Sequence, residues 1–349
     1  MIPTLKDVAE RAGVHPSTVS RVLQGKENLP ISEKTRTSIF AIAKELNYQP
    51  NQLARAFRLK KTQTIGLIVP DISNPFFSGI ARSIEICSRR KDYTVVLGNT
   101  DENQDREIRM INNLLSRGID GLILAPVQDR SGHIKDLCNR NFPLVLIDRC
   151  FDELETNAVI SDNEEAAFNA ISYLAQAGHR RIGFISGRKN IYTIRKRFLG
   201  YQKGIKTFDL VDDSELVSDN GFTLESGYHS TRKILSLPKS PTALLISGNK
   251  ITVGAMKAIF EKKLSIPDDI SLIGFTDFIG SPYWVVPMTT ITHPVKEMGE
   301  AAFNLLFNNM ATKETVPHSK MMVATKLNIR GSVKNLALAD FAANSFPQG

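Results

Sequence analysis

Hydrophobic positions in residues 4–24 have the spacing of two short helices joined by a tight turn. Apolar or small side chains recur at i, i+3 and i+4 on both sides of Gly13, and glycine suits the turn between them. Thr4 suits the N-cap of the first helix, and Pro16 suits the first turn of the second. The pattern predicts a helix–turn–helix unit.

A third helical run begins after Ser32, a good N-cap, and ends before Pro50, because proline disfavours helix in the residue that precedes it. We therefore predict a small all-α head over residues 1–48. Residues 49–62 are basic and polar, with too little apolar surface to fold alone, so we interpret them as a hinge that orders only when bound.

From Thr64 onward the pattern changes to short apolar runs that alternate with amphipathic segments. Residues 65–70 (IGLIVP) form the first continuous apolar run, as expected of a buried parallel strand, and residues 182–187 (IGFISG) resemble them. Strands and helices alternating over this length predict two doubly wound α/β subdomains, with ligands at the carboxyl ends of the strands.

Composition and charge limit the functions open to the chain. Residues 1–61 hold eleven basic and five acidic side chains, so most of the net charge of +8 lies in the head and hinge, which is typical of nucleic-acid binding. The second helix presents Ser17, Thr18, Ser20 and Arg21 outward, which suits phosphates and base edges. An ordinary helical hairpin would share the spacing but not this charge.

The 349-residue sequence lacks features that several classes of protein require. No run spans a bilayer and the N-terminus has no signal-peptide core, so we expect a cytoplasmic protein rather than a periplasmic sugar-binding one. The three cysteines have neither disulfide nor zinc spacing. Phosphate-loop, dinucleotide, nucleophile-elbow and zinc-protease motifs are missing, so we expect no enzyme, cofactor or metal site.

The motifs occur together in one order over nearly the whole chain. Residues 4–24, then RTSIFAIAKELNYQPNQLARAF, IGLIVPDISNPFF, GIDGLILAPV, PLVLIDR, GHRRIGFISG, RFLGY and PDDISLIGF resemble the lactose-repressor and purine-repressor family of bacterial transcription regulators. The resemblance implies a helix-turn-helix head and a periplasmic-binding-protein-like core of two doubly wound parallel-sheet subdomains. It implies residues 63–161 and 291–320 for the N-terminal subdomain, and residues 162–290 and 321–335 for the C-terminal one. The resemblance ends near Ser332, and residues 336–349 form a tail.

The resemblance further implies a homodimer that binds a pseudo-palindromic operator, with hinge helices in the minor groove. The positions that it assigns to DNA binding are Thr4, Pro16, Ser17, Thr18, Arg21, Asn28, Asn51, Arg55 and Phe57. Arg21 is expected to contact guanine, whereas Pro16 replaces a polar side chain and cannot donate a hydrogen bond. Phe57 stands where the family has a leucine that wedges between base pairs. His15 is expected to contact phosphate or to cap the second helix.

The same resemblance implies a small-molecule effector in the cleft between the subdomains, whose binding allosterically changes operator affinity. The positions that match the family's effector site are Phe76, Phe77, Asp148, Arg149, Thr193, Arg197, Phe222, Asn249, Thr276 and Asp277. Whether the effector releases DNA or promotes its binding is left open.

We expect a carbohydrate effector. The basic segment 188–197, together with Thr276 where the family has an acidic residue, favours a sugar acid or a sugar phosphate. If the charges of residues 188, 189, 195 and 196 are instead solvated, neutral sugars fit. A purine, or a protein co-effector such as a phosphorylated carrier protein, would also be compatible with this family.

Overall fold

The computed structural model describes residues 3–23, 30–49, 61–127, 130–277, 280–311 and 318–337. The chain divides into two compact units, Met1–Thr62 and Gln63–Gly349. No helix in these described ranges is both long and apolar enough to span a membrane.

The first unit is a three-helix head with helices α1 (Leu5–Ala12), α2 (Pro16–Leu23) and α3 (Glu33–Glu45). Thr4 and Asp7 form a capping box at the start of α1, in which the Thr4 main-chain N–H donates to the Asp7 carboxylate at 2.7 Å. Gly13 adopts the left-handed conformation (φ 63°) that ends α1, as the sequence predicts. The buried residues of the head core are Val8, Ala9, Val19, Val22, Ile39 and Ala43.

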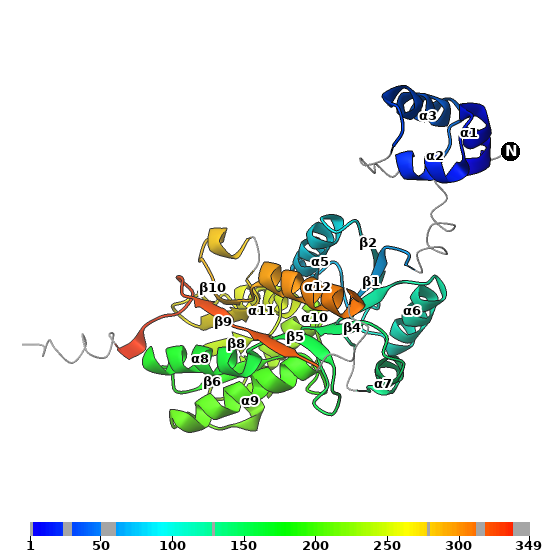
Figure 1. Ribbon diagram of the computed structural model, residues 1–349. Coiled ribbons are helices and arrows are strands. Elements are labelled where there is room, and N and C mark those ends of the chain that lie inside the picture. Colours follow the sequence, from blue (N-terminus) through cyan, green and yellow to red (C-terminus); the bar gives the residue numbers. More distant parts are fainter. Residues whose placement is uncertain are drawn as a thin grey trace, which may run out of the picture. The chain divides into compact units, whose positions relative to one another are not determined.

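The second unit contains two subdomains, each built on a six-stranded sheet (Figure 1). The first sheet has the order β11-β5-β4-β3-β1-β2 and is parallel throughout. Its elements are β1 (Thr64–Val69), α5 (Pro75–Arg89), β2 (Thr94–Asn99), α6 (Gln104–Ser116), β3 (Gly121–Leu124), α7 (Gly132–Asn139), β4 (Leu144–Ile147), β5 (Asn157–Ser161), α12 (Val295–Ala311) and β11 (Lys320–Val323).

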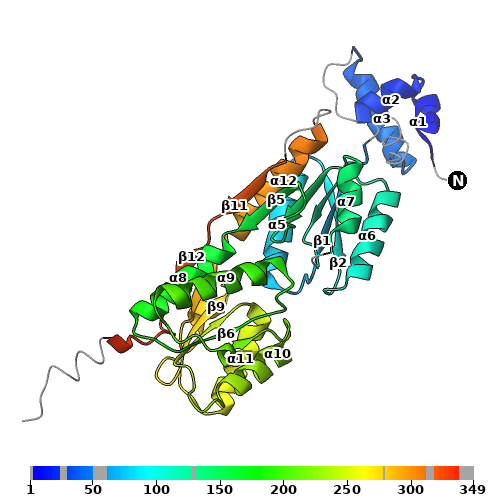
Figure 2. The same cartoon turned by 90° about the horizontal axis from the view of Figure 1, so that it is seen from below.

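Helices cover both faces of this sheet (Figure 2). Helices α5 and α12 pack together on one face, and α6 and α7 cover the other. Strand β1 shows why its sequence is apolar without interruption: Ile65, Leu67 and Val69 join the core under α5 and α12, whereas Ile68 joins the core under α6 and α7.

The second sheet has the order β12-β10-β9-β8-β6-β7 and is parallel except for β12, which runs antiparallel to β10. Its elements are α8 (Asn163–Gln176), β6 (Ile182–Ile185), α9 (Tyr192–Thr207), η1 (Ser214–Leu216), β7 (Val217–Ser218), α10 (Leu224–Ile234), β8 (Ala243–Ile246), α11 (Asn249–Glu261), β9 (Ser271–Phe275), η2 (Ser281–Tyr283), β10 (Thr289–Thr292) and β12 (Lys326–Asn328). Strands β1 and β6, whose sequences resemble each other, occupy the same place in the two sheets.

Three chain segments cross between the subdomains, after β5, β10 and β11. The first follows Ser161, the last residue of β5. Strand β10 pairs within the second sheet, so the first subdomain resumes after residue 292 rather than at residue 291. Strand β11 pairs with β5, so the second resumes after Val323 rather than at residue 321. Strand pairing decides both boundaries, and hydrophobic spacing along the chain does not report it.

Candidate functional site

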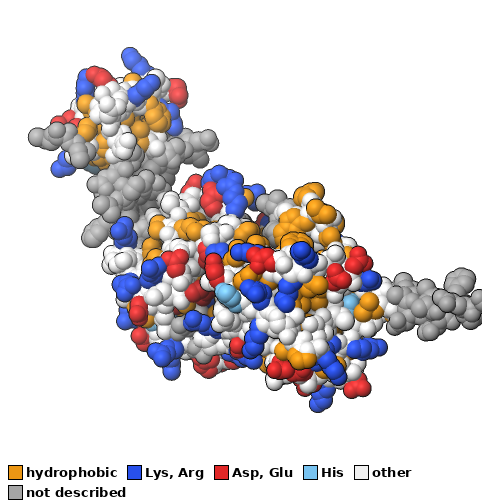
Figure 3. Space-filling view, turned by 180° about the vertical axis from the view of Figure 1, so that it is seen from behind, with side chains coloured by type: hydrophobic (Ala, Val, Ile, Leu, Met, Phe, Trp, Pro, Cys, Tyr) orange, Lys and Arg blue, Asp and Glu red, His pale blue; other side chains and the backbone are white. Residues whose placement is uncertain are grey.

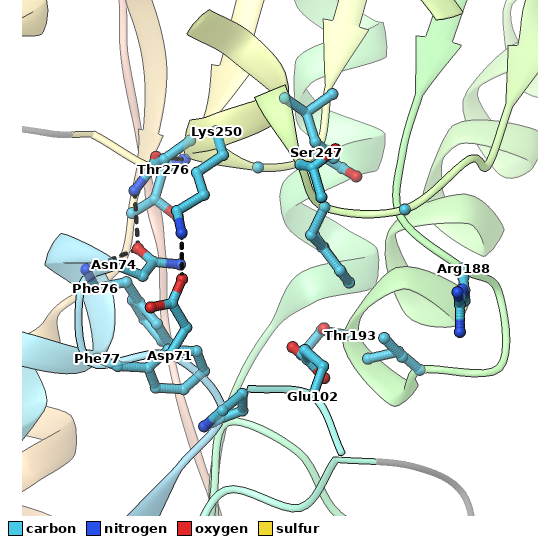
Figure 4. A pocket seen from close by; sticks show the side chains of 18 of the residues that line it. Asp71, Asn74, Phe76, Phe77, Glu102, Arg188, Thr193, Ser247, Lys250 and Thr276 are labelled. Atoms are coloured by element: carbon cyan, nitrogen blue, oxygen red, sulfur yellow. Dashed lines mark hydrogen bonds and ion pairs between the residues drawn. The ribbon is translucent and has the colours of Figure 1, made fainter. Parts of the chain in front are cut away.

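A cavity of about 830 Å³ lies where the carboxyl ends of the two sheets face each other (Figure 4). Its lining comes from the segments that follow β1, β2, β3, β4, β6, β7, β8 and β9, which is where doubly wound sheets bind ligands. Its polar and aromatic side chains include Asp71, Asn74, Phe76, Phe77, Glu102, Asp148, Arg149, Arg188, Thr193, Arg197, Phe222, Ser247, Asn249, Lys250 and Thr276.

Arg197 enters the cavity from α9 and is held by neutral partners. Its Nε donates to Asn163 Oδ1 at 2.7 Å, its Nη1 to the Ser247 carbonyl at 3.0 Å, and its Nη2 to His293 Nε2 at 3.3 Å. The guanidinium also lies over the Phe275 ring, 4.2 Å from its centroid. Burial lowers the pKa of Arg197 to about 10, so it remains charged near neutral pH.

Arg149 also lines the cavity, but a carboxylate neutralises it. Its Nη1 and Nη2 bind the two oxygens of Glu102 at 2.9 and 2.7 Å, and Nη1 also donates to the Pro126 and Val127 carbonyls. Burial opposes the charge of Arg149, but Glu102 and Asp148 raise its pKa above the ordinary value. Asp148 is 4% exposed, and burial raises its pKa despite the neighbouring Arg149 and Arg197.

Three buried polar atoms on residues that line the cavity have no hydrogen-bond partner in the described part of the chain. They are Asp148 Oδ1, Arg149 Nε and Ser247 Oγ. Buried polar atoms are nearly always paired, and an unpaired one costs about 1–3 kcal/mol. Asp148 Oδ2 lies 3.8 Å from Arg149 Nε, so an unpaired acceptor and an unpaired donor belong to neighbouring groups.

Side chains of the two subdomains meet directly at one side of the cavity. Lys250 Nζ donates to Asp71 Oδ2 at 2.6 Å, and Asn249 Nδ2 donates to Asn74 Oδ1 at 3.2 Å (Figure 4). Asn249 also accepts a hydrogen bond from the Thr276 main-chain N–H at 2.9 Å. These contacts therefore join the two subdomains directly at one side of the cavity.

Nine of the ten expected effector positions line this one cavity: Phe76, Phe77, Asp148, Arg149, Thr193, Arg197, Phe222, Asn249 and Thr276. Asp277 does not line it. Its carboxylate binds Arg330 at 2.8 Å and accepts from Ser281, so it fastens the end of the second sheet. Asp277 directly follows Thr276 in the sequence. Matching to the positions of a family does not show where a side chain points, so it could not reveal that Asp277 lies outside the cavity lining.

Sequence reasoning missed Asp71, Glu102, Ser247 and Lys250 as lining residues. Three of them, Asp71, Ser247 and Lys250, follow a buried strand by one to four residues, so polar residues just after strands were the available signal. Glu102 follows β2, and only the folding of the chain brings it next to Arg149.

In the basic segment 188–197, which was expected to favour an anion, three of the basic side chains form ion pairs at the surface. Lys189 pairs with Asp219 at 3.7 Å, Arg195 with Asp152 at 3.0 Å and Lys196 with Glu164 at 3.6 Å. Arg188 does line the cavity. Basic and acidic side chains are likewise intermingled on the face of the core that Figure 3 shows.

The head presents the outer side of α2 as expected. Ser17 and Arg21 are exposed, and Pro16 and Thr18 are half-buried. His15 caps α2, because its Nδ1 accepts from the Ser17 main-chain N–H at 3.3 Å and lies 2.8 Å from Ser17 Oγ. Thr4 is exposed and caps α1. The remaining expected DNA contacts, Asn28, Asn51, Arg55 and Phe57, lie outside the described residues.

Comparison with known protein families identifies both units. Residues 4–51 match the family described as bacterial regulatory proteins, lacI family, and residues 171–333 match the periplasmic binding protein-like domain. The chain is 32% identical to catabolite control protein A of Priestia megaterium, over 95% of this chain and 99% of that protein. It is 33% identical to the transcriptional repressor CytR of Escherichia coli K12, over 95% and 97%.

Solved structures agree with this assignment. The lac repressor dimer bound to operator and the anti-inducer ONPF superposes with a TM-score of 0.85 at 26% identity, covering 96% of this chain and 100% of that one. A LacI family regulator from Enterococcus faecium with bound ribose gives a TM-score of 0.70 at 26% identity, covering 78% and 99%. The chain therefore belongs to the lacI family of bacterial regulatory proteins, and is a DNA-binding transcriptional repressor with an effector-binding domain.

Proposed function

We propose that the effector is a neutral polyhydroxylated molecule, a sugar, bound in the cavity between the two subdomains. The observation that carries this proposal is the cavity lining, in which carboxylates and arginines lie together with the aromatic rings of Phe76, Phe77 and Phe222. A sugar hydroxyl both donates and accepts, so it can pair with either kind of charged group. A cavity of about 830 Å³ has room for one or two sugar rings.

The charges around the cavity favour a neutral ligand over the anion that the sequence suggested. Five acidic residues (Asp71, Asp101, Glu102, Asp148 and Glu225) face four basic ones (Arg149, Arg188, Arg197 and Lys250). Glu102 already neutralises Arg149, and Asp71 pairs with Lys250. An anionic oxygen could accept a hydrogen bond from Arg149 but could not donate one to Asp148. The carboxylates of Glu102 and Asp148 would also repel it.

Apolar rings complete a site that suits a sugar. The rings of Phe76 and Phe77, at the start of α5, pack edge to face with their centroids 5.0 Å apart. Phe222 lines the cavity from the opposite subdomain. Sugar rings present apolar C–H faces, which pack on aromatic rings while the hydroxyls reach polar groups at the edges. The E. faecium relative solved with ribose supports the same class of ligand.

A thermal-shift series on the purified full-length chain tests the proposal. The series compares D-ribose, D-glucose and cellobiose with gluconate, glucose 6-phosphate and hypoxanthine. A compound at about 100 times its Kd stabilises the fold by about 2.7 kcal/mol, which is readily seen. We expect a shift from a neutral sugar, and a smaller shift in the Ser247→Ala variant.

Three results would contradict the proposal. A shift caused only by gluconate or glucose 6-phosphate would return the assignment to an anion. A shift caused only by hypoxanthine would indicate a purine site. A chain that responds to none of these compounds, and whose operator binding is restored by a phosphorylated carrier protein, would indicate the protein co-effector.

A further inference from the structure

His293 lies outside the cavity lining, between β10 and α12, where the chain crosses from one subdomain to the other. The side chain is buried, with 2% exposure. Its ring meets the Phe76 ring of the N-terminal subdomain edge to face at 5.2 Å and lies 6.1 Å from the Phe275 ring of the C-terminal subdomain. His293 thus contacts both subdomains directly behind the cavity.

The partners of His293 fix which ring nitrogen carries the proton. Arg197 can only donate, so His293 Nε2 must accept its hydrogen bond at 3.3 Å. The proton of the neutral ring is then on Nδ1, which donates to Ser161 Oγ at 3.0 Å. Burial and the neighbouring Arg197 lower the pKa of His293 well below its ordinary value, consistent with a neutral ring.

Ser161 continues the series of hydrogen bonds into the N-terminal subdomain. Its hydroxyl donates to Met298 Sδ at 3.4 Å, so its oxygen is available to accept from His293. Met298 lies on α12 in the core beneath α5, beside Phe76 and Phe77, which line the cavity. Hydrogen bonds therefore run in one direction from Arg197 through His293 and Ser161 to Met298, across two of the segments that join the subdomains.

A second hydrogen-bonded connection holds the same guanidinium to the crossing after β5. Asn163 Oδ1 accepts from Arg197 Nε, while Asn163 Nδ2 donates to the Ser161 carbonyl at 3.1 Å. Arg197 is thereby fixed at two nitrogens by residues of the crossing segments. A displacement of its guanidinium must change at least one of these bonds.

We propose that His293 is a positioning residue that orients the Arg197 guanidinium toward the cavity and couples its position to the N-terminal subdomain through Ser161 and Met298. This inference rests on the proposed function for its biological meaning, since Arg197 is a proposed effector contact. Its physical content concerns the ligand-free protein and can be tested there.

Methyl NMR of the ligand-free, full-length chain tests the coupling. The chain holds eight methionines, so the Met298 methyl signal can be assigned with a Met298→Leu variant. We expect Arg197→Gln to displace the Met298 signal by more than its line width in the otherwise native chain. In a His293→Phe background, which keeps the ring against Phe76 but has no ring nitrogens, we expect Arg197→Gln to leave that signal in place.

Two further variants separate positioning from general destabilisation. His293→Gln retains an acceptor for Arg197, so it should restore the response of the Met298 signal. His179→Phe removes another buried histidine, bonded to Thr242 and the Lys334 carbonyl, and should leave the response intact. The Arg197 Nε–H signal should broaden in His293→Phe and not in His179→Phe.

An equal displacement of the Met298 signal in the native and His293→Phe backgrounds would overturn the proposal, as would no displacement in either. Since these readouts need no effector, failure of the sugar assignment leaves them unaffected. Conversely, a sugar-induced thermal shift would stand even if this coupling were disproved.

Discussion

At the scale of single residues, the two cavity arginines differ in whether a carboxylate already neutralises them. Arg149 binds both oxygens of Glu102 with its terminal nitrogens, so its charge is already paired. Arg197 makes one hydrogen bond from each nitrogen. A guanidinium carries five N–H groups, so Arg197 has one N–H left on each terminal nitrogen for a ligand. Arg197 is therefore the stronger candidate for gripping an effector.

Replacing Arg197 by alanine should abolish the effector response. Each charged hydrogen bond lost costs about 1.5–3 kcal/mol, so affinity for the sugar that shifts the wild type should fall by at least about tenfold. Calorimetric titration with that sugar measures the loss. The control is Arg195→Ala on the same helix, whose surface pair with Asp152 lies outside the cavity. Loss of ligand-free operator binding in Arg197→Ala alone would instead indicate a structural role.

Asp277 should contribute to stability in a pH-dependent way. Partial burial opposes its charge, but hydrogen bonds from Arg330 and Ser281 hold its pKa at about 2, below the ordinary value of 3.8. A group with a depressed folded-state pKa stabilises the fold above the unfolded-state pKa, and that contribution is lost as the pH falls through the folded-state pKa. The stability difference between wild type and Asp277→Asn should therefore shrink between about pH 4 and about pH 2.

Urea unfolding of wild type and Asp277→Asn at a series of pH values measures this difference. Using the difference cancels the titration of carboxylates that both proteins share. A gap between the two proteins that stays constant below about pH 4 would show that the Arg330 pair does not depend on the charge of Asp277.

At the scale of elements, α2 of the head is the surface that should read DNA. Its buried residues Val19 and Val22 fix which side faces outward, and Arg21 is exposed there. Arginine at such a position pairs with guanine in the major groove, and a bidentate contact gives about 1–3 kcal/mol of discrimination. Base reading and charge attraction can then be separated by comparing Arg21 with another exposed basic residue.

Replacing Arg21 by alanine should reduce the preference for operator over random DNA by about 10- to 100-fold. Lys6→Ala, on exposed α1, should weaken binding to both DNAs alike and lower the salt dependence. Fluorescence anisotropy with both DNAs at matched salt gives the ratio. An unchanged ratio in Arg21→Ala would refute base reading by this side chain.

Much of the fold could be predicted because its strands are buried on both faces. The apolar runs 65–70 and 182–187 correspond to β1 and β6, and the predicted alternation of apolar and amphipathic segments corresponds to the alternating strands and helices of the core. The apolar pattern did not locate β5, β7, β10, α12, β11 and β12. Strand β11 has three exposed residues out of four, and β7 has only two residues, so neither carries a strong local pattern. They are strands because of pairing with distant segments.

The site was predictable to the extent that it follows strand ends. Family positions located nine cavity residues, but the partners that set their charge came from elsewhere in the sequence. Helix α9 begins at Tyr192 and so carries Thr193 in its first turn. The pairing of Glu102 with Arg149 spans 47 residues and no local pattern reports it.

At the scale of the whole molecule, exposed apolar side chains indicate where a second copy should bind. Val96 and Leu97 of β2, together with Val253 and Phe260 of α11, are each more than a third exposed. Strand β2 is also an edge of its sheet, with one row of main-chain groups unpaired by β1. The related lac repressor structure is a dimer.

Introducing a carboxylate on β2 or on α11 should weaken the dimer. We expect Leu97→Glu and Val253→Glu each to raise the dimer dissociation constant by at least about tenfold, because burying an unpaired charge costs more than about 1.4 kcal/mol. Sedimentation equilibrium measures the change. Leu199→Glu on α9, at 41% exposure against 45% for Leu97, is the matched control. Equal effects of Leu97→Glu and Leu199→Glu would place the interface elsewhere.

Binding of a neutral sugar between the subdomains should change the affinity of the repressor for DNA. The contacts Lys250–Asp71 and Asn249–Asn74 join the subdomains directly, so a ligand that inserts among them favours one relative arrangement of the two. An effector can shift operator binding only because its own affinity differs between the two arrangements.

The most direct measurement is the dissociation constant for an operator selected from random DNA, with and without the sugar that shifts the melting temperature. We expect this dissociation constant to change by about 5- to 150-fold, and the same sugar should have no effect on the Arg197→Ala variant. If a sugar binds the cavity yet leaves the operator dissociation constant unchanged, that sugar does not control DNA binding.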